Sequence, residues 1–157
     1  MPKLTHLDDH GNSRMVEVGK KPMTDREAVA EGFIRLSSET MDLLKSGQVA
    51  KGDVLSVAQL AGIQGSKRTA DLIPLCHPIP LTGVDVALEL VETGVRVSAC
   101  ARAHWRTGVE MEALTAVSVT LLTLYDMLKA VDRSLEMDTI RLLEKRGGRS
   151  GEWIRNP

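Results

Sequence analysis

Alternating hydrophobic and polar positions predict a β-hairpin in the middle of the chain. Residues 83–92 and residues 95–103 each alternate apolar and polar side chains, with Thr93-Gly94 between them. A period of two is typical of a strand that buries one face, and a glycine in a two-residue connection favours a tight turn. The sequence therefore predicts two antiparallel neighbours here.

Upstream, residues 25–36 fit two patterns at once. Small or apolar residues alternate at the even positions from 28 to 36, whereas Glu27, Glu31 and Arg35 recur at helical spacing. We interpret the segment as a strand because a helix start comes directly after it. The cluster Ser37-Ser38-Glu39-Thr40 offers an N-cap for a short helix over residues 41–44, and that helix is expected to stop at Gly47.

Two further helices are predicted, one of ordinary length and one long. Asp53 is a suitable N-cap for a helix over about residues 54–64. Residues 110–132 contain neither glycine nor proline and are apolar almost all round. Such a helix needs cover from a sheet and, on its other side, from another subunit. On the first helix, the side expected to be buried carries Val54, Val57, Leu60, Ala61 and Ile63.

The two ends of the chain are polar. An extended N-terminal arm over about residues 1–14 is expected to lead into a short strand at residues 15–18. The last strand is predicted at residues 139–145, and a basic, glycine-rich tail follows over about residues 145–157. No repeat or linker divides residues 1–157. The order of elements predicts a single α+β domain of ferredoxin-like type, an antiparallel sheet with helices packed on one face.

Composition excludes several classes of partner. The 20 Lys and Arg residues nearly balance the 21 Asp and Glu residues, and only 3% of residues are aromatic. We therefore expect no nucleic acid and no membrane as a partner. The first residues carry charge where a signal peptide needs an apolar core, which indicates a cytoplasmic protein. Cys76 and Cys100 form no C-x-x-C pair and are expected to be reduced.

The sequence P-L-C-H-P at residues 74–78 is the first candidate for chemistry. A metal site is one reading, with Cys100 or His104 as further ligands, but nothing in the sequence fixes these residues near His77. A packed structural histidine is the second reading. Prolines hold a backbone extended and leave its donors and acceptors outside a helix, so we favour a third, a ligand-binding loop.

Basic residues indicate that the ligand includes an anion. A single exposed lysine is most simply a solvated surface residue. In the tail, however, cations stand beside Gly147, Gly148 and Gly151, and glycines allow a backbone to approach an anion closely. The spacing is not that of a Walker A loop. The candidate contacts are Lys51, Lys67, Arg68, Lys145, Arg146 and Arg149.

Asp126 and Lys129 lie one helical turn apart, close enough to form an ion pair. The simple reading is a surface salt bridge, but apolar neighbours indicate burial, which would shift both pKa values and suit proton transfer. Glu112 lies fourteen residues before Asp126, about 21 Å away along a continuous helix. If both residues act on one small molecule, the site lies between subunits.

Five segments carry a resemblance to a known family. They are K-G-D-V at 51–54, K-R-T at 67–69, D-L-I-P-L-C-H-P at 71–78, T-G-V-E-M-E-A-L-T at 107–115 and Y-D-M-L-K-A-V at 125–131. Together they resemble the cyclic pyranopterin monophosphate synthase family, also called molybdenum cofactor biosynthesis protein C. The resemblance extends from about Leu4 to Trp153.

The resemblance implies a ferredoxin-like subunit in a homohexamer, a trimer of dimers with active sites at subunit interfaces. It implies a lyase that acts in molybdenum cofactor biosynthesis without a cofactor or metal. The expected partner is a small nucleotide or pterin molecule. The reaction converts (8S)-3′,8-cyclo-7,8-dihydroguanosine 5′-triphosphate into cyclic pyranopterin monophosphate and pyrophosphate.

By the same resemblance, the family's catalytic positions fall on Asp126, Lys129 and Lys51. Its substrate-binding positions fall on Leu75, Cys76, His77, Met111, Glu112, Lys67 and Lys145.

The tail departs from the family's usual K-S-G-G-K-S-G, because Arg146 and Arg149 replace its serine and its second lysine. Arginine keeps the charge but changes the hydrogen-bonding geometry, so we expect phosphate binding to survive. The alternative function is a non-catalytic nucleotide- or pterin-binding module, which would need no proton-transfer pair.

Overall fold

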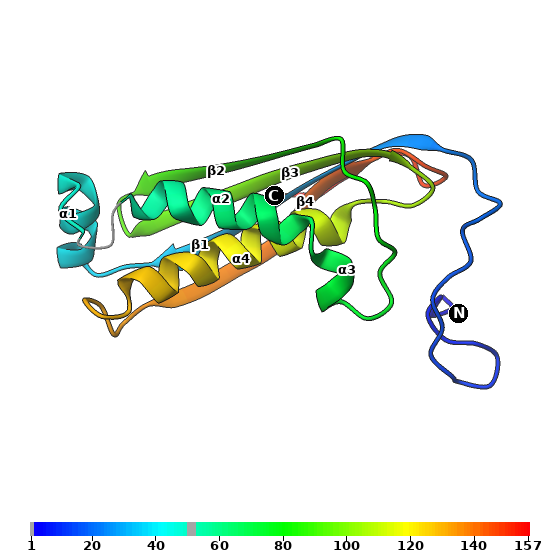
Figure 1. Cartoon of the computed structure of the whole chain (residues 1–157), viewed down its shortest axis with the longest axis horizontal. Helices are drawn as coiled ribbons and strands as arrows, with labels where there is room; N and C mark the ends of the chain where they lie inside the picture. The colour runs from blue at the N-terminus through cyan, green and yellow to red at the C-terminus, as the bar shows by residue number, and fades with distance from the viewer. Residues whose placement is uncertain (1, 50–52) are drawn as a thin grey trace.

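The computed structural model describes residues 2–49 and 53–157, which form a sheet covered by helices (Figure 1). Within these residues, five antiparallel strands lie in the order β2-β3-β1-β4-β5. The strands are β1 (Thr24–Arg35), β2 (Gly83–Val91), β3 (Gly94–Trp105), β4 (Glu136–Arg146) and β5 (Trp153–Ile154). The helices are α1 (Ser38–Ser46), α2 (Val54–Ser66), α3 (Thr69–Leu72) and α4 (Glu110–Leu128).

The order of the elements in space confirms the predicted fold class. Helices separate β1 from β2, a tight turn joins β2 to β3, and α4 leads to β4. With β1 between β3 and β4, this is the ferredoxin-like arrangement. Both α2 and α4 lie on one face of the sheet (Figure 1). The predicted antiparallel sheet with helices packed on one face is thus correct.

Small side chains let α4 approach the two central strands closely. The inner face of β1 and β3 is buried and lined mainly by alanine. A Cβ on Gly32 would lie 2.6 Å from Cγ1 of Val117, so this glycine leaves room for the helix. By length and hydropathy α4 could cross a membrane, but it lies along the sheet as a core helix. The alanines are Ala28, Ala30, Ala99, Ala101 and Ala103.

The contact between α2 and α4 is made by the smallest residues of α2, which corrects the predicted buried face. A Cβ on Gly62 would lie 2.0 Å from Oγ1 of Thr120, and one on Gly65 would lie 2.7 Å from Val119. Val57 and Leu60, expected inside, are 45% and 65% exposed. These two side chains point outward because the side of α2 that packs on α4 has room only for glycine at positions 62 and 65. Val54, also expected inside, is 3% exposed, so this part of the prediction is correct.

The predicted helix caps are confirmed. The side chain of Ser37 accepts a hydrogen bond from Thr40 N, and Asp53 accepts one from Ser56 N at 3.0 Å. Gly47 ends α1 with a φ of 69°, in the left-handed region that glycine adopts without strain.

The end of α4 and the start of β4 differ from the prediction, and one short helix was missed. α4 ends at Leu128 rather than at residue 132, because the Asp132 carboxylate accepts hydrogen bonds from the backbone N–H groups of Ser37 and Ser134 and so belongs to the turn. β4 accordingly begins at Glu136, earlier than the expected residue 139. The short helix α3 was not predicted.

The strand expected at residues 15–18 is absent from the described chain. The carbonyl oxygen of Val16 lies 2.6 Å from Nε2 of His77 instead of joining a ladder. The arm before it folds on itself, with Leu7 and Ser13 in an isolated bridge. The Asp8 carboxylate closes that turn by accepting a hydrogen bond from Asn12 N at 2.8 Å.

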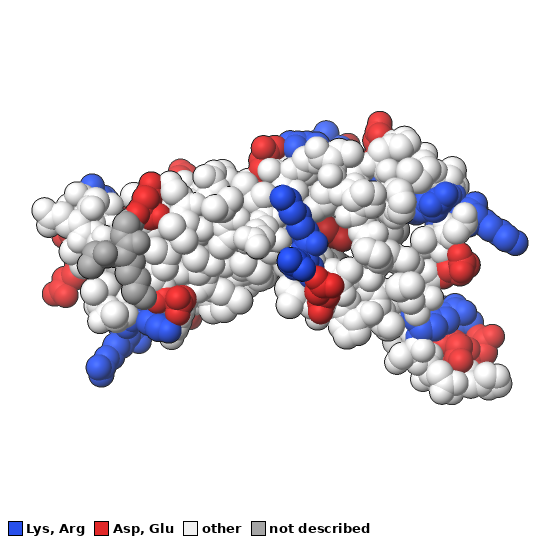
Figure 2. All heavy atoms as spheres, in the orientation of Figure 1, with Lys and Arg blue, Asp and Glu red and all other residues white. Residues whose placement is uncertain are grey.

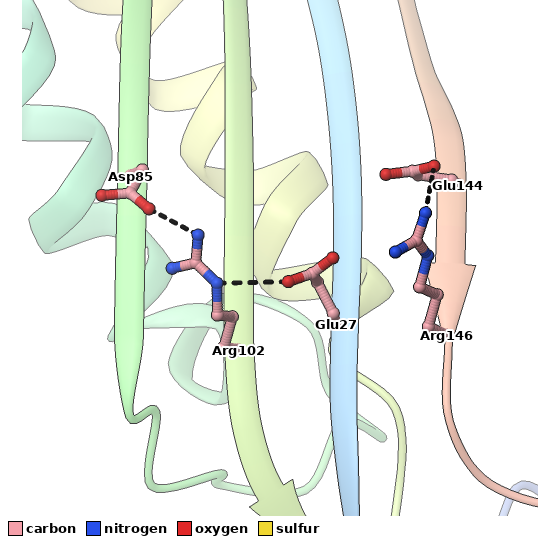
Figure 3. A network of polar contacts seen from close by, with 5 residues as sticks. All are labelled: Glu27, Asp85, Arg102, Glu144 and Arg146. Atoms are coloured by element: carbon pink, nitrogen blue, oxygen red, sulfur yellow. Dashed lines mark hydrogen bonds and ion pairs between the residues drawn. The ribbon is translucent and has the colours of Figure 1, made fainter.

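The outer face of the sheet is charged (Figure 3). Arg102 on β3 reaches to both neighbouring strands, with Nη2 2.6 Å from Asp85 and Nε 3.2 Å from Glu27. Arg141 and Glu31 form a similar cross-strand pair at 2.8 Å. Opposite charges across neighbouring strands stabilise their pairing and keep this face hydrated.

Candidate active site

The predicted site residues divide between the two ends of α4. Asp126 and Lys129 lie at its C-terminal end. The others lie near its N-terminal end, and Lys51 is outside the described residues. Because α4 is one continuous helix, Glu112 and Asp126 are separated by about 21 Å of helix rise. The N-terminal group contains Lys67, Leu75, Cys76, His77, Met111, Glu112 and Lys145.

Glu112 is a buried carboxyl in the N-terminal group. It lies in the first turn of α4 and is 4% exposed. Burial raises the pKa of Glu112 to about 7, and the charge of Glu110 adds to the effect. It shares a cavity of about 340 Å³ with Lys67 and Thr69. A carboxyl with this pKa can donate or accept a proton near neutrality.

The proline-flanked segment lines a neighbouring cavity. Leu75 and Cys76 face a space of about 460 Å³ together with Met111 and with His6 of the arm. Burial raises the pKa of the Cys76 thiol, and the nearby charge of Glu112 contributes. The segment and the start of α4 therefore lie together, as the resemblance implies for residues that bind one substrate.

His77 is engaged by the N-terminal arm. Its Nε2 donates to the carbonyl oxygen of Val16, since a carbonyl only accepts. This contact fixes the proton on Nε2 and connects the arm to the candidate site. A ligand that binds His77 through Nε2 has to displace Val16.

The glycine-rich tail contributes to a cationic cavity that the sequence prediction described only in part. Gly147, Gly148 and Gly151 all have positive φ, between 64° and 100°. A Cβ on Gly148 would lie 2.2 Å from the Arg26 guanidinium, so glycine permits this close approach. The cavity measures about 680 Å³, and its cations are Lys20, Lys21, Arg26, Arg106 and Arg149.

Of these cations the prediction had named only Arg149. Lys20 and Lys21 could have been noticed as an adjacent basic pair before Pro22. Arg26 and Arg106 gave no signal in the sequence, because they lie 80 residues apart in the chain. The pairing of β1 with β3 brings them together, and the Arg26 guanidinium donates to the Arg106 carbonyl oxygen at 3.3 Å. Within the described part of the chain, Nε of Arg106 is buried without a hydrogen-bond acceptor. This donor is available to an anion.

The pair at the other end of α4 differs from its prediction. Lys129 Nζ lies 2.6 Å from Asp126 Oδ1, as the spacing predicts. Both side chains, however, are more than half exposed, at 58% and 66%, so the expected burial is wrong for the single chain. The hydrogen bond to Asp126 raises the pKa of Lys129. In water such a pair is screened and adds little to stability.

The residues that the alternative interpretation assigned to a metal site do not lie together. Cys100 and His104 share the outer face of β3, where His104 Nδ1 is 2.8 Å from Asp25. Cys76 lies in the loop on the helix side. Among the described residues, no three or more His, Cys, Asp or Glu side chains are grouped to hold a metal ion.

Comparison with known proteins connects these groups to one family. The family model for the MoaC family matches residues 15–148, which contain every predicted site residue except the candidate anion contact Arg149. The chain belongs to the MoaC family. Only the arm and the last residues of the tail lie outside the matched range.

Individual relatives agree over almost the whole chain. A cyclic pyranopterin monophosphate synthase of Brucella ovis is 59% identical over 153 residues, covering 96% of this chain and 93% of that protein. One of Thermomicrobium roseum is 57% identical over 157 residues, covering 99% and 95%. A third, of Brucella canis, is 58% identical over 153 residues. The predicted family resemblance is confirmed.

Proposed function

We propose that this chain is a cyclic pyranopterin monophosphate synthase of molybdenum cofactor biosynthesis. The observation that carries the proposal is membership of the MoaC family, with relatives of that name 57% identical over 99% of the chain. The substrate is (8S)-3′,8-cyclo-7,8-dihydroguanosine 5′-triphosphate, and the products are cyclic pyranopterin monophosphate and pyrophosphate.

The proposed chemistry needs a cationic pocket and groups that transfer protons. A sugar hydroxyl attacks the α-phosphorus and forms a new P–O bond, while the bond to pyrophosphate breaks. Cations stabilise the charge that develops on the leaving group. Ring opening and ring closure need proton transfers, for which carboxylates and lysines are suitable. No redox step is involved, so the reaction needs no redox cofactor.

We assign roles according to the position of each group. Asp126, Lys129 and Lys51 transfer protons. The triphosphate is held by His77, Lys67, Lys145 and the cationic cavity at the tail. The ring system is bound where Leu75, Cys76, Met111 and Glu112 lie together.

The active site is proposed to lie between copies of the chain. One small molecule cannot contact both ends of α4 in a single copy, since they are about 21 Å apart. The helix-covered face also has large uncharged areas between its charged groups (Figure 2). Apolar side chains exposed on α2 and α4 include Val57, Leu60, Leu122 and Tyr125. We propose a cytoplasmic homohexamer, a trimer of dimers, in which this face packs against a second copy.

Substitution of Asp126 tests the catalytic assignment. Asp126→Asn keeps the shape but removes the carboxylate, so kcat is expected to fall by a factor of about 100 or more. Pyrophosphate release and cyclic product are measured together. Asp85→Asn is the matched control, because Asp85 is 72% exposed and also pairs with a cation at 2.6 Å.

Two results would contradict the proposal. Full turnover by the Asp126 variant would exclude the proton-transfer role. Tight binding of the cyclised nucleotide without turnover by the unmodified protein would favour the alternative, a non-catalytic binding module.

A further inference from the structure

Glu110, which has no assigned role, forms an ion pair with Lys145. Lys145 Nζ lies 3.0 Å from Glu110 Oε1, and the two side chains are 33% and 29% exposed. Glu110 is the first residue of α4 and Lys145 lies near the end of β4. A carboxylate in the first helical turn is stabilised by the helix dipole. The pair therefore joins the helix layer to the sheet at the N-terminal end of α4.

The backbone of Lys145 is fixed, but its side chain is long. Lys145 stands opposite Ala28 on β1 and opposite Trp153 on β5, so strands hold it on both sides. The four-carbon stem still has many rotamers. A hydrogen bond from the ammonium to Glu110 selects one of them and leaves the remaining N–H donors for another acceptor.

The Glu110 carboxylate lies in space that is left open by the missing side chain of Gly108. A Cβ on Gly108 would lie 2.3 Å from Glu110 Oε2 and 2.8 Å from its Cδ. The carboxylate thus occupies space that any side chain at position 108 would need. Gly108 has no positive φ, so the missing side chain, rather than an unusual backbone, is what matters here.

Glu110 also acts on a second residue of the candidate site. After burial, its charge is a further cause of the raised pKa of Glu112. Lys145 and Glu112 are both proposed to bind substrate, and Glu110 interacts with each of them. The charge of Glu110 therefore acts on two residues that are proposed to bind substrate.

We propose that Glu110 is a positioning residue that holds the Lys145 ammonium in the orientation that binds the substrate's phosphates. The proposal rests on the proposed function of Lys145. Glu110 itself contacts no phosphate, because both carry negative charge. Its effect on substrate binding is exerted through Lys145.

Conservative substitution of Glu110 tests this role. Glu110→Gln keeps the size of the side chain but removes its charge, so KM is expected to rise roughly tenfold with kcat within a factor of about two. Glu110→Asp keeps the charge and should recover part of the loss. Glu89→Gln is the matched control, since Glu89 pairs with Arg96 at 3.2 Å between two strands on the outer face.

Gly108→Ala moves the carboxylate without removing either charge. Its effect on KM should have the same sign as that of Glu110→Gln, while thermal unfolding stays close to that of the unmodified protein. In a double-mutant cycle, Glu110→Gln should add little to Lys145→Met, because both remove one interaction. Full additivity would overturn the proposal, and so would a lower KM, which would mean that Glu110 competes with substrate for the ammonium.

Binding of inorganic pyrophosphate separates this inference from the proposed function. Calorimetry with the intact protein should show roughly tenfold weaker pyrophosphate binding for Glu110→Gln. If the unmodified protein has no turnover, the proposed function fails, yet this binding difference still tests Glu110. Equal pyrophosphate affinity in both proteins would overturn the positioning role.

Discussion

Thr40 and Asp132 are joined by a buried hydrogen bond, in which Thr40 Oγ1 donates to Asp132 Oδ2 at 3.0 Å. The same oxygen accepts from Ser37 N at 2.9 Å. The other oxygen of Asp132 accepts from the backbone and side chain of Ser134, at 2.8 and 2.6 Å. One carboxylate therefore connects the start of α1 to the turn between α4 and β4.

Replacement of Asp132 is expected to destabilise the fold. In Asp132→Asn, an amide N–H group faces groups that are themselves hydrogen-bond donors. The free energy of unfolding is therefore expected to fall by about 3 kcal/mol. Urea unfolding monitored by circular dichroism measures it. Asp71→Ala is the control, because Asp71 forms an exposed ion pair with Arg68 at 3.4 Å. Its removal is expected to change stability by about 0.5 kcal/mol or less. A loss for Asp132→Asn as small as that of the control would contradict the prediction.

The contribution of Asp132 should depend on pH. Burial opposes ionisation of this carboxyl, but hydrogen bonds from Ser134, Ser37 and Thr40 outweigh it and hold the pKa of Asp132 well below its usual range. A lowered folded-state pKa gives stability that is present above about pH 4, the unfolded value, and is lost as the pH falls below it. The difference in unfolding free energy between the unmodified protein and Asp132→Asn should shrink on acidification.

Glu112 should show the opposite dependence. Its pKa is raised from 4.5 to about 7 by burial, so the folded state binds more protons than the unfolded state between these values. Stability therefore falls as the pH rises through this range. Glu112→Gln should be more stable than the unmodified protein at pH 8, by on the order of 2 kcal/mol, and equal to it near pH 4. The activity of Glu112→Gln is expected to fall. If this variant were less stable than the unmodified protein at pH 8, the predicted pH dependence would be wrong.

Close packing between α2 and α4 can be tested at Gly62. Alanine favours a helix over glycine by about 1 kcal/mol. At position 62, however, its Cβ would lie 2.0 Å from Thr120 Oγ1 and 2.9 Å from the Ala116 carbonyl. Overpacking costs about 1 to 3 kcal/mol, so Gly62→Ala should destabilise. Adding Thr120→Ala to Gly62→Ala removes the nearer contact and should restore part of the lost stability. If the double variant lost the sum of the two single-variant losses in stability, the two residues would not be in direct contact.

Interface sites predict that two inactive variants complement each other. Asp126→Asn and Glu112→Gln damage opposite ends of α4, so a mixed assembly contains sites with both ends intact. After random exchange of chains, activity should return to about a quarter of the unmodified level. The control mixes Asp126→Asn with a chain that carries both substitutions, because no site in that mixture has an intact Asp126. Activity no higher than in this control would place both residues in one chain's site or outside it.

Local signals in the sequence predicted most elements of the fold. The cluster at residues 37–40, of which Ser37 is the cap, and the residues Gly47 and Asp53 mark helix ends through their own side chains or backbone. Such ends can be predicted directly from the sequence. The hairpin around Thr93-Gly94 is equally local. These predictions depend on residues that lie within a few positions of each other.

Predictions that depend on tertiary contacts were less successful. Val57 and Leu60 were expected inside because they are apolar, yet close helix packing at Gly62 selects small residues for the inner side of α2. Burial of Asp126 was inferred from apolar neighbours. Leu121, Leu124 and Leu128 are indeed buried, but Leu122 is 55% exposed, and Asp126 is exposed as well. The cationic cavity was found only in part for the same reason.

Because α4 is one continuous helix, its two ends cannot belong to the same site. Under the proposed interface arrangement, every copy supplies one end of its helix to one site and the other end to a different site. An open row of copies would leave an unmatched end at each extremity. Only an assembly with closed symmetry completes one site for every chain. Closure is then a condition for full specific activity, in addition to any effect it has on stability.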